Sequence, residues 1–86
     1  MYRVLLARPA DRFFERADAT LQRRLDQCFD DLRRDPRGLP GLRALSGKYA
    51  GHLRYRVGAY RVVFRIDDPA RIVIVAVIGH RREVYR

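Results

Sequence analysis

Apolar and polar residues alternate along residues 51–65, on both sides of a glycine near the middle of the stretch. This alternation, interrupted by Gly58 and Ala59, predicts a β-hairpin with a two-residue type II′ turn, because that turn needs a positive φ at its first central residue. The turn also sets the register and places Arg54 opposite Val63. One face of the predicted hairpin is apolar and carries Leu53, Tyr55, Val57, Tyr60, Val62, Phe64 and Ile66.

The opposite face of this hairpin, which we call the arginine face, carries His52, Arg54, Arg56, Arg61 and Arg65. In the predicted register Arg56 lies opposite Arg61, and like charges directly opposite each other destabilise a strand pair. A single arginine on a sheet often does no more than cover apolar surface with its stem. Four arginines on one face favour a surface that binds phosphate, since each guanidinium offers a planar fork of donors.

The pattern before the hairpin predicts one strand and two helices. Residues 2–6 are expected to form a strand, and Pro9 suits the first turn of a short helix that fades at Ala17. A second helix is expected to begin at a cap formed by Asp18 or Thr20. Its apolar stripe recurs at helical spacing and comprises Leu21, Leu25, Cys28, Phe29 and Leu32.

Turn-forming residues divide the rest of the chain. Asp35 and Pro36 are expected to end the second helix, and residues 37–47, with three glycines and a proline, to form a loop. Residues 71–78 are apolar on both faces and predict a buried central strand, which Gly79 is expected to end. A polar tail that starts with His80 should then emerge beside the arginine face.

The predicted order β-α-α-β-β-β indicates an α+β fold. We expect one domain, residues 1–86, in which a helical hairpin covers one face of a small sheet rich in antiparallel pairs. The arginine face is the one left open.

Composition narrows the classes of partner. The chain has 86 residues, with 19 basic against 10 acidic residues and a formal net charge of +9, which favours a polyanion such as nucleic acid. The lone Cys28 excludes an internal disulfide and fits a reducing cytoplasm. No apolar run is long enough to span a membrane and no signal peptide is recognisable, so we expect a cytoplasmic protein with no membrane partner.

Three runs of the sequence together resemble the RelE/ParE superfamily of bacterial type II toxins: LSG at 45–47, GHLRYRVGAYRVVF at 51–64 and GHRREVY at 79–85. The resemblance covers nearly the whole chain. It implies a RelE-like toxin, a ribosome-dependent endoribonuclease that cuts mRNA, or a ParE-like toxin that poisons DNA gyrase. The presence of Arg61, Arg81 and Tyr85 favours the RelE-like branch.

The resemblance also implies roles for single residues. Arg54, Arg61 and Arg81 match the family's phosphate-contacting positions, and Tyr85 matches a terminal tyrosine that stacks on a base. Arg54 departs from the pattern, where lysine is usual. An arginine keeps its proton under all working conditions and cannot be the general base, so the titrating candidates are His52 and His80. Further RNA contacts are expected from Arg56, Arg65, Arg82 and Lys48.

The implied partners are the ribosome, mRNA and a cognate antitoxin, RelB-like, acidic and encoded beside the toxin. Neither a metal nor another cofactor is expected, because Asp67 and Asp68 lie in a turn without suitable neighbours and no histidine or cysteine spacing suggests zinc. Two alternatives stay open: a gyrase inhibitor that cuts no bond, and a non-catalytic RNA-binding module.

Overall fold

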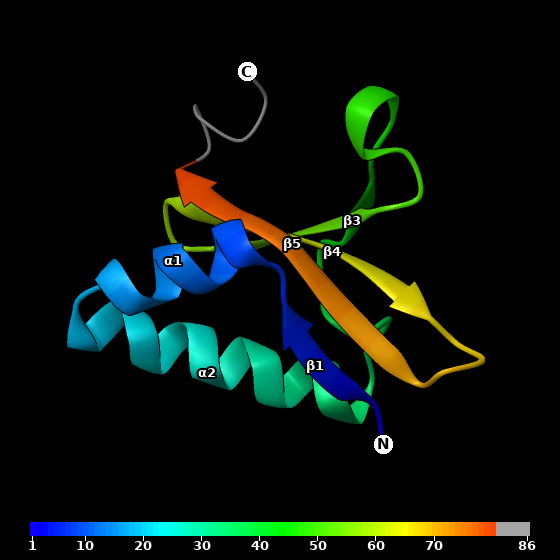
Figure 1. The fold of residues 1–86 in the computed structure, drawn as a ribbon, viewed down its shortest axis with the longest axis horizontal. Coiled ribbons are helices and arrows are strands. Elements are labelled where there is room, and N and C mark those ends of the chain that lie inside the picture. The colour runs from blue at the N-terminus through cyan, green and yellow to red at the C-terminus, as the bar shows by residue number, and fades with distance from the viewer. Residues whose placement is uncertain (81–86) are drawn as a thin grey trace.

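The computed structural model describes residues 1–80, which form a five-stranded sheet with two helices on one side (Figure 1). The elements are β1 (Arg3–Leu6), α1 (Arg8–Arg16), α2 (Ala19–Arg34), β2 (Arg43–Ala44), a 3₁₀ helix η1 (Gly47–Tyr49), β3 (Leu53–Val57), β4 (Tyr60–Asp67) and β5 (Ile72–His80). The strand order is β1-β5-β4-β3-β2. Only the β1–β5 pair is parallel among the four pairings, so the predicted α+β fold with a mainly antiparallel sheet is confirmed.

Both helices begin and end where the sequence signals lie. Pro9 stands in the first turn of α1, where a missing N–H costs nothing. The Asp18 carboxylate caps α2 by accepting a hydrogen bond from the Leu21 N–H at 2.8 Å, so Asp18 and not Thr20 is the cap. The apolar stripe of α2 then faces the sheet.

The β3–β4 hairpin has the predicted register, with Arg54 opposite Val63 and Arg56 opposite Arg61. Gly58 adopts a φ of +61°, as a type II′ turn requires at its first central residue. Because the register is fixed, the alternating side chains of both strands divide between the two faces of the sheet.

The main core lies between the helices and the sheet. Side chains of α2, including Leu25 and Leu32, meet Val62, Phe64 and Val73 of the strands, and all of these are fully buried. Cys28 belongs to this cluster, and burial together with nearby Asp31 raises the pKa of its thiol to about 12. The thiol therefore stays protonated and behaves as a small apolar side chain, as expected.

The segment expected to be a plain loop, residues 37–47, contains one short strand, and a 3₁₀ helix begins at its last residue. Arg43 and Ala44 form β2, an edge strand that pairs with Arg54 and Leu53, and η1 begins at Gly47. Two residues give no alternation that a sequence pattern could reveal, and β2 exists because β3 offers it backbone partners.

The prediction that Gly79 ends the last strand is wrong. β5 continues to His80, and Gly79 pairs with Arg61 inside the ladder. The register shifts between Val63, which pairs with Val77, and Phe64, which pairs with Val75, so β5 carries a bulge. β5 is an interior strand as expected, although β4 occupies the middle of the sheet.

Candidate nucleic-acid interface

Arg54 and Arg61 lie on adjacent strands and on the face of the sheet away from the helices. Arg54 is paired with Val63, two residues from Arg61, so the two arginines are diagonal neighbours with Cβ atoms about 7 Å apart. Both side chains are half-buried, and the Nε atom of each is buried. The guanidinium groups are therefore held close to the sheet surface.

Val63 accounts for the partial burial of the Arg54 and Arg61 side chains against the sheet. It is fully buried, yet it points away from the helices and does not belong to the main core cluster. On this face Val63 pairs with Arg54 of β3 and with Val77 of β5, and Arg61 and Arg65 lie two residues away along β4. Charged side chains cover apolar surface with their stems, so Val63 supports the arginines that cover it.

Gly79 contributes space beside Arg61. It pairs with Arg61 across β4 and β5, and it presents no side chain at that position. The long Arg61 side chain can therefore extend over β5.

The other arginines of this face are more exposed. Arg56 donates from Nε to the Gly58 carbonyl oxygen at 3.1 Å, which holds its side chain at the hairpin turn. Arg65 is exposed and lies opposite Ile74 of β5. Both are placed to widen a cationic surface around Arg54 and Arg61.

His52 joins the arginine face at the start of β3. Its backbone carbonyl accepts a hydrogen bond from the Leu45 N–H at 3.0 Å, which prolongs the β2–β3 ladder by one position and keeps His52 on the face of Arg54. The ring contacts Tyr49, with centroids 5.6 Å apart, and its Nδ1 lies 3.3 Å from the Ala50 carbonyl oxygen. Lys48 is exposed on the neighbouring η1.

The expectation that His80 lies among the arginines is not met. His80 pairs with Tyr60, whose side chain is on the helix side of the sheet, and the two rings are 5.9 Å apart. The ring of Tyr60 in turn contacts Phe13 of α1 at 5.5 Å. The cause is the continuation of β5 through Gly79, because strand alternation then turns the next residue to the opposite face.

An open cleft of about 590 Å³ lies on that helix side. Phe13, Tyr60 and Ile78 line it, with Arg12 and Arg16 among its other lining residues. The cleft is thus separated from Arg54 and Arg61 by the sheet.

The remaining predicted site residues, Arg81, Arg82 and Tyr85, lie outside the described residues. Within residues 1–80, no group of three histidine, cysteine or acidic side chains is arranged to hold a metal ion. In the same range, neither helix has the length and hydropathy needed to cross a membrane.

Sequence reasoning missed two residues of this surface. Val63 reads simply as another apolar residue of a strand, and its role depends on the arginines around it. Tyr49 had a usable signal, an aromatic residue beside Lys48 in a short segment bounded by Gly47 and Gly51.

Comparison with known proteins identifies the family to which the chain belongs. A family model described as "ParE toxin of type II toxin-antitoxin system, parDE" matches residues 4–85. The chain belongs to this toxin family. Toxin RelG of Mycobacterium tuberculosis is 38% identical over 61 residues, an alignment that takes in 69% of this chain and 66% of that relative.

Solved structures agree with the membership in the ParE toxin family. The toxin–antitoxin complex RelBE2 from M. tuberculosis contains a chain 28% identical to this one, with a TM-score of 0.78 and coverage of 93% of this chain and 98% of that one. The isolated RelE toxin of Escherichia coli, 21% identical, covers 99% of this chain and 92% of its own, also with a TM-score of 0.78. The resemblance to the RelE/ParE superfamily is thereby confirmed.

Proposed function

We propose that this member of the toxin family is an endoribonuclease that cuts mRNA on the ribosome. The observation that carries the proposal is the placement of Arg54 and Arg61 as diagonal, half-buried neighbours on a face that the helices leave open. Two guanidinium groups held in this way can bind the non-bridging oxygens of one phosphate. Toxin RelG and the RelE structures, which resemble this chain, support a RelE-like activity.

The chemistry needed is attack of an RNA 2′-oxygen on the adjacent phosphorus. The 2′-hydroxyl loses its proton, a P–O bond forms, and the bond to the 5′-oxygen breaks as that oxygen takes up a proton. Negative charge increases on the phosphate oxygens in the transition state, and preorganised cations stabilise it there. Arg54 and Arg61 supply this charge, and the proposal assigns Arg81 the same role.

Proton transfer needs a group other than arginine. His52 is the histidine on the arginine face, two residues from Arg54 along the chain, and we assign it as the candidate acid or base. His80 faces the helix side and is left out of the phosphate contacts. Tyr85 is assigned to stacking on a base, and Arg56, Arg65, Arg82 and Lys48 to flanking phosphates.

We further propose a cognate antitoxin as the partner that controls this activity. A similar toxin is solved as the toxin–antitoxin complex RelBE2, which supports a RelB-like partner. A net charge of +9 favours an acidic partner, and an extended segment could cover a wide surface of this kind. The proposed site of action is the cytoplasm, where ribosomes and mRNA meet the toxin.

Inhibition of DNA gyrase is the second candidate, and the description of the matching family as a ParE toxin favours it. In that case the arginines would contact a protein and no bond would be cut. The two candidates differ in their target, so one pair of assays separates them.

The test is primer extension on an mRNA translated in a cell-free system, run beside a gyrase supercoiling assay with the same protein preparation. We expect new 5′ ends that appear only when ribosomes occupy the message, and no loss of supercoiling. Inhibited supercoiling with intact mRNA would replace the nuclease with the gyrase inhibitor. Addition of purified antitoxin should abolish whichever activity is found.

A further inference from the structure

A short protrusion, residues 47–51, lies beside the arginine face and has a backbone conformation that requires glycine at both of its ends. η1 lies between Gly47, with a φ of +64°, and Gly51, with a φ of +82°. No heavy atom lies within 4 Å of a Cβ added at either glycine, so the backbone conformation and not crowding requires glycine there. Hydrogen bonds of 3.0 Å, from Ala50 N–H to Gly47 O and from His52 N–H to Tyr49 O, close the turn.

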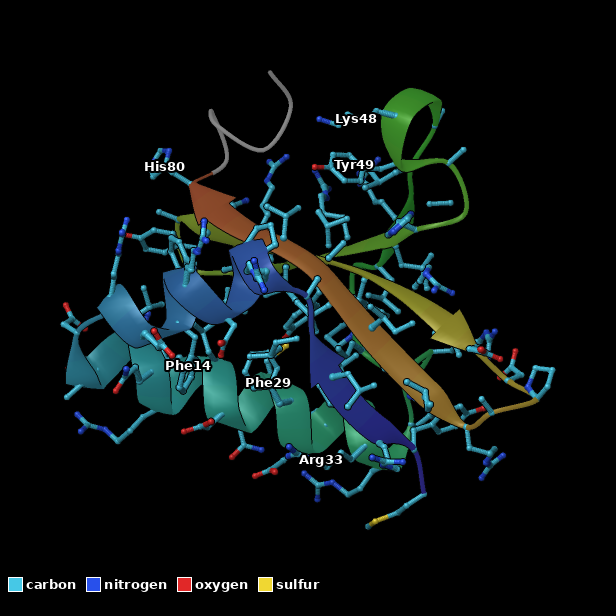
Figure 2. The ribbon with its side chains drawn as sticks, viewed as in Figure 1. Phe14, Phe29, Arg33, Lys48, Tyr49 and His80 are labelled. Carbon is cyan, nitrogen blue, oxygen red and sulfur yellow. The ribbon has the colours of Figure 1, made fainter. Side chains whose placement is uncertain are left out.

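The protrusion directs Tyr49 toward the arginine face. The Tyr49 ring contacts the His52 ring at 5.6 Å with an interplanar angle of 77°. His52 is held on the face of Arg54 by the prolonged β2–β3 ladder. In Figure 2 the Tyr49 and Lys48 side chains both extend from η1 toward the side on which β5 ends at His80.

Core packing does not account for Tyr49. Its side chain is half-buried, but it is not among the partly buried apolar side chains that pack against the core cluster of the described residues. Its ring neighbours are cationic or titratable: Lys48 Nζ lies 5.6 Å from the ring centroid, and His52 lies beside the ring. A partly exposed aromatic ring beside basic side chains is an arrangement with which proteins hold single-stranded nucleic acid.

We propose that Tyr49 is a stacking platform for a base of the RNA next to the phosphate that Arg54 and Arg61 contact. This inference rests on the proposed function and adds a residue that contacts the substrate near the start of β3. Single-stranded RNA offers unstacked bases that aromatic side chains can take up. Lys48, at the same protrusion, would pair with a phosphate beside that base.

The first test needs no cleavage. The ligand is a short single-stranded RNA with 2′-O-methyl riboses, which lacks the attacking hydroxyl. Fluorescence anisotropy measures the affinity of the protein for this RNA and for a series of the same RNA in which one abasic site is placed at successive positions. Wild type should lose about 10-fold in affinity when the abasic site reaches Tyr49, since one base–aromatic stack has that order of effect. Tyr49→Leu should bind both RNAs alike, and Tyr49→Phe should behave as wild type.

Tyr2→Leu is the matched control. Tyr2 is also half-buried, with its ring 4.4 Å from Arg71 Cζ, but it precedes β1 and hydrogen-bonds Asp68 beyond the end of β4. It should keep the abasic effect of wild type. Thermal unfolding of each variant verifies that the fraction folded is equal under the assay conditions.

The second test is single-turnover cleavage on programmed ribosomes, where Tyr49→Leu should lower the rate at subsaturating toxin by about 10-fold. An equal abasic effect in wild type and Tyr49→Leu would overturn the stacking proposal. So would a Tyr49→Leu variant that loses affinity only for the antitoxin, because the ring would then belong to a protein interface. Failure of wild type to cut mRNA would remove the proposed nuclease, whereas the abasic comparison would still decide the role of Tyr49.

Discussion

The two faces of β3 and β4 carry residues that alternate along the strands, but one face packs into the core and the other carries the proposed binding site. On the helix side, Val62 and Phe64 are fully buried in the main core. On the other side, Val63 is equally buried, but three of its neighbours are arginines, Arg54 on β3 and Arg61 and Arg65 along β4. One face is covered by the helices, and the other carries the arginines that would bind the substrate.

The difference shows how a small domain separates stability from function. Apolar contacts on the helix side stabilise the sheet without approaching the phosphate site, and the like charges of Arg56 and Arg61 are confined to the open side. A substitution should therefore change either stability or activity, depending on which face it alters. Val63 is the exception, because it belongs to both.

Arg61→Ala should have the largest effect on activity. Removal of one preorganised cation from a phosphate site should lower single-turnover cleavage on the ribosome at least ~100-fold. The fold should persist, because Arg61 lies on the open face and removing it relieves its repulsion with Arg56. Circular dichroism and thermal unfolding check the fold, and primer extension measures the rate.

Arg23→Ala is the control for this loss of charge. Arg23 is exposed on α2, where its guanidinium donates a weak hydrogen bond of 3.4 Å to Thr20 Oγ1. The Arg23→Ala substitution lowers the net charge by the same amount as Arg61→Ala. It should leave the cleavage rate within about twofold of wild type, because a distant exposed charge is screened. Equal losses in both variants would show that net charge, and not the position of Arg61, controls cleavage.

Val62→Ala and Val63→Ala form a matched pair with an intermediate effect. Each deletes two methyl groups at a fully buried position, so each should lower the free energy of unfolding by about 2 kcal/mol, measured with urea. Only Val63→Ala should also slow cleavage per folded molecule, several-fold, because Arg54 and Arg61 lose their support. Equal cleavage rates in the two variants would contradict the role given to Val63.

Much of the fold was predictable because local signals agreed with one another. The glycine turn fixed the hairpin register, and the cap at Asp18 and the stripe of α2 fixed the second helix. Two features depended on partners distant in sequence and could not be predicted. β2 exists only through pairing with β3, and β5 passes Gly79 because Arg61 and Tyr60 continue the ladder.

In the candidate site, too, the features set by local signals could be predicted and those that depend on distant residues could not. Strand alternation was enough to place Arg54 and Arg61 on one face, since the register was known. His80 was misplaced, because the face of a residue at a strand end depends on where the strand stops. The burial of Val63 required knowledge of which side chains fold over it, and no periodicity reports that.

The smallest effect on stability is expected at Asp68, just beyond the end of β4, which hydrogen-bonds Tyr2 before β1 and Arg37 after α2. Its carboxylate accepts two hydrogen bonds from Arg37, at 3.0 and 2.8 Å, and one from the Tyr2 hydroxyl at 2.6 Å. These bonds, first those from Arg37 and then that from Tyr2, lower the pKa of Asp68 to about 2. Because the folded-state pKa lies below the ordinary value of 3.8, this stabilisation is complete above about pH 4 and is lost as the pH falls toward 2. Asp68→Asn should therefore be less stable than wild type at neutral pH, by less than Val62→Ala, because the group is exposed and screened by solvent. Urea midpoints of the two proteins should converge between pH 4 and pH 2. Cleavage at neutral pH should be unchanged, because Asp68 lies just beyond the last residue of β4 whereas Arg61 lies near the first. A constant difference in midpoint across this range would show that the Asp68 carboxylate does not stabilise the fold through its charge.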